Sequence, residues 1–232
     1  MSDYQELKEQ AWEINRQLPI SGLVQHTFGN ASALDGRRGV FAIKPSGVPF
    51  ADLTPQSMVV VDLECKTVEG KLRPSSDTRT HAVLYRAWKE IAGIVHTHSL
   101  YAVAWAQAME PIPVLGTTHA DYLAEDIPCT DVMTDEMVKG DYEEETGNQI
   151  LKTFATLSHR EVEMVLVACH GPFTWGRTPE KALENSIVLE QIARMAYLTL
   201  AINPDTPRLK RSLLHKHHER KHGPDAYYGQ HD

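Results

Sequence analysis

The stretch Gly93-Ile94-Val95-His96-Thr97-His98-Ser99 joins a short apolar run to two histidines that stand two residues apart. Such a run, bounded by polar residues, predicts a strand over residues 92–98. Alternate side chains of a strand project to the same face, so His96 and His98 are expected to point toward one spot. Two converging imidazoles are typical of a divalent metal site. This stretch therefore predicts both a strand of the fold and part of a metal site.

A second apolar run, Met164 to Cys169, also leads into a histidine. His170 follows it, and Gly171-Pro172 is expected to end this strand and leave the imidazole at its edge. Asp77 is a candidate fourth ligand. Three histidines with an open or weakly held fourth position are typical of a catalytic zinc site, whereas a closed set of thiolates is typical of a structural one. Zn²⁺ is the first choice, and Mn²⁺, Co²⁺ or Ni²⁺ would fit the same ligands.

Helical and strand patterns are mixed along the whole chain. Amphipathic spacing and capping residues predict helices over 3–18, 78–88, 100–108 and 145–157, with a long helix from Thr178-Pro179-Glu180. The buried face of that helix is expected to include Val188, Ile192, Met195 and Ala196. Apolar runs predict strands over 39–43, 58–63, 92–98 and 163–169. This mixture predicts an α/β sandwich in which helices cover a sheet.

Composition limits the class of protein. The 232 residues are 42% hydrophobic and 23% charged, which suits one domain over 1–232. The net charge of −8 argues against a nucleic-acid partner, although 208–221 is locally basic and is interpreted as a solvated terminal helix. The sequence has no signal-peptide pattern and no apolar run as long as a membrane span. Its three widely spaced cysteines suit a reducing cytoplasm, and Cys169 is expected to be a buried packing residue.

Three short loop motifs combine small residues with hydrogen-bond donors: Gly29-Asn30, Ser46-Gly47 and Ser75-Ser76. Such groups bind phosphate without adding a large charge, and a helix that begins after Ser76 would add its dipole. Each motif alone is typical of an ordinary turn. Together with a metal site they indicate a small phosphorylated substrate.

Seven motifs in this order resemble the L-ribulose-5-phosphate 4-epimerases of the class II aldolase superfamily. They are Thr27–Ser32, Ile43–Val48, Pro74–Thr78, Gly93–Ser99, Gly116–Tyr122, His170–Phe173 and Arg220–Gln230, and the likeness runs from about residue 5 to 230. The resemblance implies a three-layer α/β/α sandwich with a largely antiparallel central sheet. It also implies a cyclic homotetramer with active sites between adjacent subunits. The implied reaction converts L-ribulose 5-phosphate to D-xylulose 5-phosphate by breaking and remaking the C3–C4 bond.

The resemblance also implies roles for individual residues. Asp77 corresponds to the fourth residue at the metal. Inversion at C4 needs two acid/base groups on opposite sides of the aldehyde, and Asp121 and Tyr228 match that pair. The neighbouring subunit contributes Tyr228 on the tail of about 208–232, while His217 and Thr117 match positions near the acid/base groups. The residues implied to bind phosphate, or to lie beside it, are Gly29, Asn30, Lys44, Ser46, Gly47, Ser75 and Ser76.

Other functions remain open at this stage. A class II sugar-phosphate aldolase is the main alternative, but such enzymes typically carry a glutamate where this chain has Asp77, which is too short for the same acid/base role. A decarboxylase of a 3-keto-sugar phosphate and a non-catalytic metal-binding module are further alternatives. A zinc hydrolase lacks support because the sequence has no His-Glu-x-x-His motif. The sequence does not distinguish an arabinose pathway from an ascorbate pathway.

Overall fold

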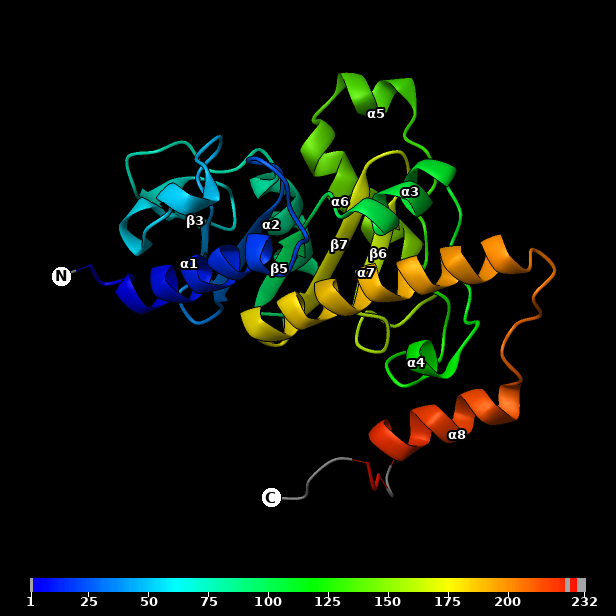
Figure 1. Cartoon of the computed structure of the whole chain (residues 1–232). Coiled ribbons are helices and arrows are strands. Elements are labelled where there is room, and N and C mark those ends of the chain that lie inside the picture. The colour runs from blue at the N-terminus through cyan, green and yellow to red at the C-terminus, as the bar shows by residue number, and fades with distance from the viewer. Residues whose placement is uncertain (1, 224–225, 229–232) are drawn as a thin grey trace.

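The computed structural model describes residues 2–223 and 226–228, and within them a seven-stranded antiparallel sheet forms the centre (Figure 1). The strands run in the order β4-β3-β2-β1-β5-β7-β6, and every neighbouring pair is antiparallel. Their bounds are β1 Asn30–Asp35, β2 Val40–Ile43, β3 Val59–Asp62, β4 Thr67–Glu69, β5 Gly93–His96, β6 Met164–Val167 and β7 Gly171–Gly176. The largely antiparallel sheet that the resemblance implied is thus confirmed.

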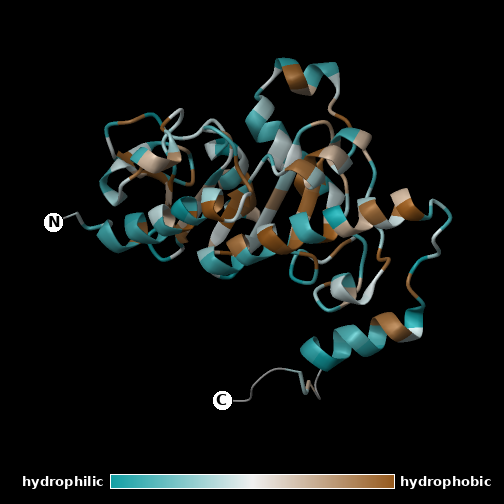
Figure 2. Cartoon of the chain, viewed as in Figure 1, coloured by the Kyte–Doolittle hydropathy of each residue, from teal (hydrophilic) through white to brown (hydrophobic). Residues whose placement is uncertain are grey.

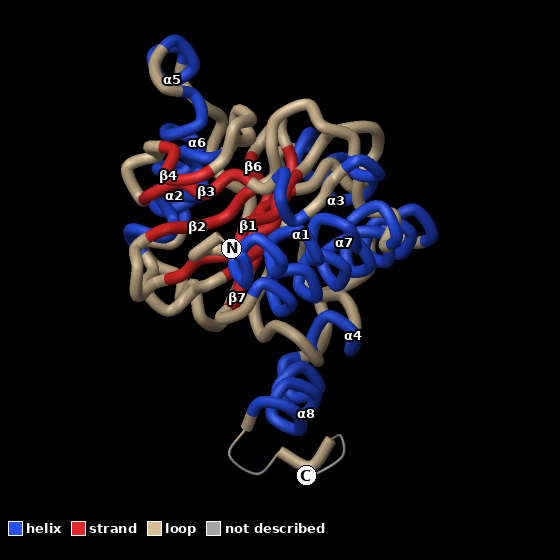
Figure 3. The backbone as a smooth tube through the Cα atoms, turned by 90° about the vertical axis from the view of Figure 1, so that its left-hand side faces the viewer, coloured by secondary structure: helices blue, strands red, loops and turns tan. Residues whose placement is uncertain are grey.

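Helices cover both faces of this sheet. Their bounds are α1 Gln5–Ile20, α2 Thr78–Ala87, α3 Leu100–Ala108, α4 Thr117–Ala120, α5 Asp135–Lys139, α6 Tyr142–Thr153, α7 Pro179–Ile202 and α8 Arg211–His222, with 3-10 turns at Phe50–Asp52 and Pro55–Ser57. With the sheet seen edge on, α1 and α7 lie on one side of it, and α2 and α6 lie on the other (Figure 3). The chain therefore has the predicted three-layer α/β/α architecture.

Alternate residues of the central strands enter two different apolar cores. Val60 and Val95 pack with α1, whereas Val61 and Ile94 belong to the core that includes α2 and α6. Covering helices explain why the runs of β2, β3 and β6 are apolar at almost every position, since both of their faces are buried. Figure 2 shows hydrophobic segments in the central strands, whereas α1 and α8 are largely hydrophilic.

Several elements differ from the sequence expectation. The strand predicted over 92–98 ends at His96, so Thr97 and His98 belong to the loop that follows β5. Gly171-Pro172 does not end the sheet, because it begins β7, which pairs with β6 as a hairpin. The turn between these strands has Cys169 at φ +62°, and its side chain is exposed rather than packed in the core. Sequence patterns also missed β1 and β4.

The long helix α7 begins as predicted. Thr178 accepts a hydrogen bond from the backbone amide of Lys181, and Pro179 takes the first turn. Val188 and Ile192 are buried, but Met195 is 40% exposed, so its prediction as a core residue was wrong. None of the described helices combines the length and the apolar character needed to cross a membrane.

Candidate metal centre and anion pocket

Three histidines meet at one end of the central strands. His96 is the last residue of β5, His98 lies in the following loop, and His170 lies in the turn before β7. Because β5 and β7 are neighbours with His96 opposite Phe173, their histidines converge, and their ligand atoms all lie within 4.8 Å of one another. The Nε2 atoms of His96 and His98 are 3.1 Å apart. Two nitrogens on one tetrahedral zinc would be about 3.3 Å apart, so this spacing suits a shared metal.

The protonation states of the three imidazoles also fit a metal. His96 Nδ1 is 2.9 Å from the Pro172 carbonyl oxygen, so Nδ1 carries the proton and Nε2 presents its lone pair to the cluster. Burial lowers the pKa of His96 to about 3 and the pKa of His170 to about 4. Burial lowers the pKa of His98 as well. All three rings are therefore neutral near pH 7, which is the form that binds a metal.

Asp77 lies beside the histidines. It stands at the position that precedes α2, yet its side chain forms no capping hydrogen bond with that helix. Instead its Oδ2 accepts a hydrogen bond of 2.6 Å from Asn30 Nδ2 and lies 4.0 Å from His96 Nε2. The carboxylate is thus turned away from the helix end, where it would add stability, and toward the histidines. The donor set of three imidazoles and one carboxylate fits a catalytic zinc or a similar divalent ion.

A cavity of about 350 Å³ lies next to this cluster. Its lining contains all four predicted metal residues and all seven residues that the sequence assigned to phosphate. The lining residues are Thr27, Phe28, Gly29, Asn30, Lys44, Pro45, Ser46, Gly47, Ser75, Ser76, Asp77, His96, His98, Tyr142, Glu143 and His170. Gly29 has φ +89°, and a Cβ there would lie 2.9 Å from the His96 carbonyl oxygen, so only glycine fits this wall.

Lys44 places a buried positive charge in the wall of the cavity, and none of the ion pairs among the described residues involves it. Its side chain is buried, and its Nζ lies 3.5 Å from the Thr27 carbonyl oxygen and 4.8 Å from the Phe50 ring centroid. Desolvation lowers the pKa of Lys44 to about 8, and no charged side chain among the described residues contributes to that shift. A buried cation without a carboxylate partner is costly to hold, and an anion bound in the cavity would remove that cost.

The predicted acid/base residues form a second cluster on α4 and α8. Asp121 follows α4 and accepts hydrogen bonds from His217 Nδ1 at 2.9 Å and from Arg220 Nη2 at 2.8 Å. Burial opposes the ionised form, but the hydrogen bonds from Arg220 and His217 lower the pKa of Asp121. The Arg220 guanidinium lies 4.6 Å from the ring centroid of Tyr228, whose side chain is 57% exposed. Thr117 is the first residue of α4.

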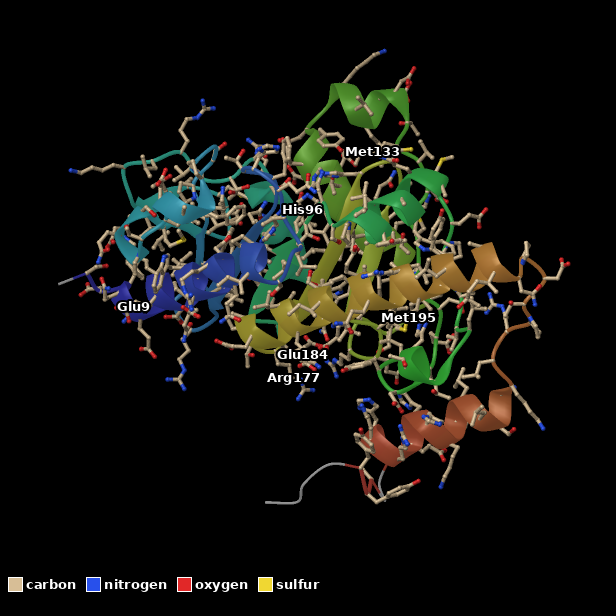
Figure 4. All side chains as sticks on the ribbon, in the orientation of Figure 1. Glu9, His96, Met133, Arg177, Glu184 and Met195 are labelled. Carbon is tan, nitrogen blue, oxygen red and sulfur yellow. The ribbon has the colours of Figure 1, made fainter. Side chains whose placement is uncertain are left out.

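These two clusters are separate within one chain. None of Asp121, Tyr228, His217 and Thr117 lines the cavity beside His96. Figure 4 shows His96 near the middle of the molecule, whereas α8 lies apart below it. The structure therefore brings together the residues predicted to bind metal and phosphate, and it places the predicted acid/base residues elsewhere. Gly229 and Gln230, which belong to the tail motif of the resemblance, lie outside the described residues.

No role was predicted from the sequence for four side chains at the site. Tyr142 and Glu143, at the start of α6, line the cavity, and the Tyr142 hydroxyl is 3.3 Å from His170 Nδ1. Phe28 stacks on His98 with ring centroids 5.7 Å apart, and Phe173 stacks on His96 at 4.2 Å. The predicted start at residue 145 left Tyr142 outside the helix. Asp141, which accepts a bond from the Glu144 amide, was the capping signal that could have located it.

The comparison with protein families identifies the class. A model of the class II aldolase and adducin N-terminal domain matches residues 9–197, which is most of the chain. The chain belongs to this family, as its sequence motifs had indicated.

Individual curated relatives can be compared with this chain over almost its whole length. The chain is 49% identical over 226 residues to the L-ribulose-5-phosphate 4-epimerase UlaF of Salmonella paratyphi A, covering 97% of this chain and 99% of the relative. The protein of the same name from Salmonella typhi has the same identity and coverage.

Solved structures share the fold. An L-fuculose 1-phosphate aldolase superposes with a TM-score of 0.77 at 23% identity, covering 95% of this chain and 97% of that one. The L-fuculose-1-phosphate aldolase of Thermus thermophilus has a TM-score of 0.65 at 26% identity and covers 88% of this chain and 98% of that one.

Proposed function

We propose that this protein is a metal-dependent L-ribulose-5-phosphate 4-epimerase that forms D-xylulose 5-phosphate by breaking and remaking the C3–C4 bond. The observation that carries the proposal is a single cavity that combines three converging neutral imidazoles with the unpaired cation of Lys44. Near-full-length identity of 49% to proteins named as this epimerase supports the choice of substrate.

The cavity divides into a metal end and a phosphate end. His96, His98 and His170, with Asp77, would hold the ion, for which Zn²⁺ is our first choice and Mn²⁺, Co²⁺ or Ni²⁺ are alternatives. Bound there, the ion would supply Lewis-acid stabilisation of the negative charge that develops when the C3–C4 bond breaks. At the other end Lys44 binds the substrate phosphate. The uncharged groups that share this task are Gly29, Asn30, Ser46, Gly47, Ser75 and Ser76.

Asp121 and Tyr228 are the proposed acid/base pair, each serving one face of the aldehyde. Because Asp121 and Tyr228 both contact Arg220, they belong to one structural unit. We propose that this unit, with His217 and Thr117, completes the metal site of a neighbouring subunit in a homotetramer. Residues 208–232 then form the tail of a single domain that spans 1–232.

Exposed apolar side chains support self-association. Met195, Leu198 and Ile202 lie along the carboxyl half of α7, and Ile202 is 86% exposed. Figure 2 shows hydrophobic segments along this part of the helix. Such a patch is typical of a surface that another molecule covers. We further propose a cytoplasmic location, which three unpaired cysteines among the described residues support.

The deciding experiment measures conversion of L-ribulose 5-phosphate to D-xylulose 5-phosphate by metal-loaded protein. A parallel assay measures aldol cleavage, and a chelated sample is the control. We expect epimerisation that the chelator abolishes and that added metal restores. Cleavage without epimerisation would instead support the alternative, a class II sugar-phosphate aldolase. Absence of both reactions would overturn the proposal.

A further inference from the structure

A ladder of polar side-chain contacts joins β1 to α2 next to the metal site. Its members are Asn30, Ser32, Asp77, His81 and Tyr85. Asn30 bonds to Asp77, and the Ser32 hydroxyl lies 2.7 Å from both His81 Nδ1 and the Tyr85 hydroxyl. Residues two apart on a strand share a face, and residues four apart on a helix share a face. Positions 30 and 32 of β1 therefore meet position 77, just before α2, and positions 81 and 85 of α2.

The part of this ladder that is formed by Ser32, His81 and Tyr85 is fully buried. Ser32 and His81 have no exposed surface, and Tyr85 is 1% exposed. His81 Nε2 has no hydrogen-bond partner among the described residues, and burial lowers the pKa of His81 to about 3, so the ring is neutral. A buried polar atom without a partner reduces stability, so an apolar side chain would pack here at less cost. Stability therefore does not explain why these polar residues are buried here.

The position of the ladder supplies that reason. In the β1–β5 register Asn30 is opposite His96 and Ser32 is opposite Ile94, so β1 lies directly beside the strand that carries a metal ligand. The His81 backbone amide donates to the Asp77 carbonyl at 3.0 Å, which ties His81 to the residue before α2. Phe173 contacts both rings, stacking on His96 and meeting His81 edge-on at 6.2 Å.

We propose that Ser32, His81 and Tyr85 are positioning residues that fix the amino end of α2, so that the Asp77 carboxylate stays within reach of the metal held by the three histidines. This rests on the metal centre of the proposed function, but not on its substrate or reaction. The ladder acts through Asp77 and contacts neither metal nor sugar phosphate.

The test titrates metal-free protein with Co²⁺ and follows its visible absorption in wild type, Ser32→Ala, His81→Leu and Tyr85→Phe. We expect Ser32→Ala and His81→Leu to weaken Co²⁺ binding about 10- to 100-fold, in the range for residues that orient metal ligands. Tyr85→Phe, farther from Asp77, is expected to have a smaller effect. Ser186→Ala is the matched control, because Ser186 is a buried hydroxyl on α7 that bonds Thr174, outside the ladder. It is expected to bind Co²⁺ as wild type does.

A second arm separates positioning from a general loss of structure. In an Asp77→Ala background, Ser32→Ala is expected to cause no further loss of Co²⁺ affinity, because the residue through which it acts is gone. If His81→Leu does not fold, as judged by circular dichroism of the metal-free protein, Ser32→Ala and Tyr85→Phe decide the question. Wild-type Co²⁺ affinity in Ser32→Ala, or equal losses with and without Asp77, would overturn the proposal. Metal binding without epimerisation would overturn the proposed function alone.

Discussion

At the scale of single residues, the charge of Lys44 makes anion binding depend on pH. The folded protein lowers the pKa of Lys44 from its ordinary value to about 8, so the cation is present below pH 8 and is lost as pH rises through it. Affinity for sulfate, whose own charge is constant over this range, is therefore expected to fall above about pH 8. The measurement is the sulfate inhibition constant of the epimerase reaction between pH 6.5 and 9.5.

Lys44→Met should remove this pH dependence and weaken sulfate binding about 10- to 100-fold, as expected for a hydrogen bond to a charged group. Lys71→Met, at an exposed lysine outside the cavity, is the control and should behave as wild type. A Lys44→Met variant that keeps the wild-type profile would show that another group titrates.

Substitution of Asp121 tests the proposed acid/base role separately from metal binding. We expect Asp121→Asn to lower kcat of epimerisation about 10²- to 10⁴-fold, as for loss of a general acid or base. Metal content should stay at the wild-type level, because Asp121 does not line the metal cavity. Asp131→Asn is a matched control, since Asp131 pairs with Lys152 at the end of α6, outside both clusters. Loss of metal from Asp121→Asn would mean that its role is misassigned.

The residues of the site differ in how far sequence could predict them. His96 and His170 follow apolar runs, so strand patterns marked each of them as a candidate ligand at a strand end, although their meeting depends on the pairing of β5 with β7. The Asn30–Asp77 bond and the Phe173 stack could not be predicted, because they depend on the pairing order of strands that are distant in sequence. Tyr142 was missed because its helix begins earlier than periodicity indicated.

At the scale of elements, the apolar strands and amphipathic helices were predictable and β1 was not. Its sequence Asn-Ala-Ser-Ala-Leu-Asp lacks large apolar residues over its first half, because Asn30 and Ser32 face polar partners on α2 rather than an apolar helix face. Likewise β7 begins with Gly-Pro, a pair that usually marks a turn. Tertiary pairing overrides local preference at both strands.

The starts of α2 and α7 give a prediction about helix capping. Thr178 caps α7 through its side chain, so Thr178→Ala should lower the free energy of unfolding by about 1 kcal/mol, with or without metal. Asp77 forms no capping bond, so any cost of Asp77→Ala to metal-free protein is expected to come from the lost hydrogen bond with Asn30 and not from the end of the helix. Zinc should then stabilise Thr178→Ala as much as wild type, and Asp77→Ala much less. Urea unfolding with and without zinc measures both effects, and equal zinc stabilisation in the two variants would contradict the assignment of Asp77.

At the scale of the whole molecule, the cavity beside His96 and the cluster around Asp121 are separate within one chain, and we propose that each is half of an active site. The fold class followed from mixed helix and strand patterns, but the assembly could not be derived from periodicity or composition. The homotetramer was predicted only from the resemblance to known epimerases. Composition alone indicated that the basic segment around α8 is a solvated terminal helix. The proposed assembly is supported by the separation of the two clusters, since Asp121 is bonded to Arg220 on α8 and does not line the cavity.

Mixed oligomers test whether neighbouring chains complete each other's sites. His96→Asn removes a metal ligand and Asp121→Asn removes an acid/base group, so each variant alone should be inactive. Co-expressed in equal amounts with different affinity tags and purified through both tags, they should form some sites with an intact metal half and an intact acid/base half. Random assembly in a cyclic oligomer makes about one quarter of the sites complete, so about one quarter of wild-type specific activity is expected before tag selection.

A second mixed oligomer tests whether Asp121 and Tyr228 reach a site from the same chain. Asp121→Asn and Tyr228→Phe both alter the unit that Arg220 holds together, so every site in their mixed oligomer receives one damaged unit and activity should stay low. Recovery there would mean that Asp121 and Tyr228 reach a site from different chains, and the shared contact with Arg220 would then lack catalytic meaning. No recovery in the first mixture would mean that each chain builds its site alone, which would require α8 to move toward the cavity within the same chain.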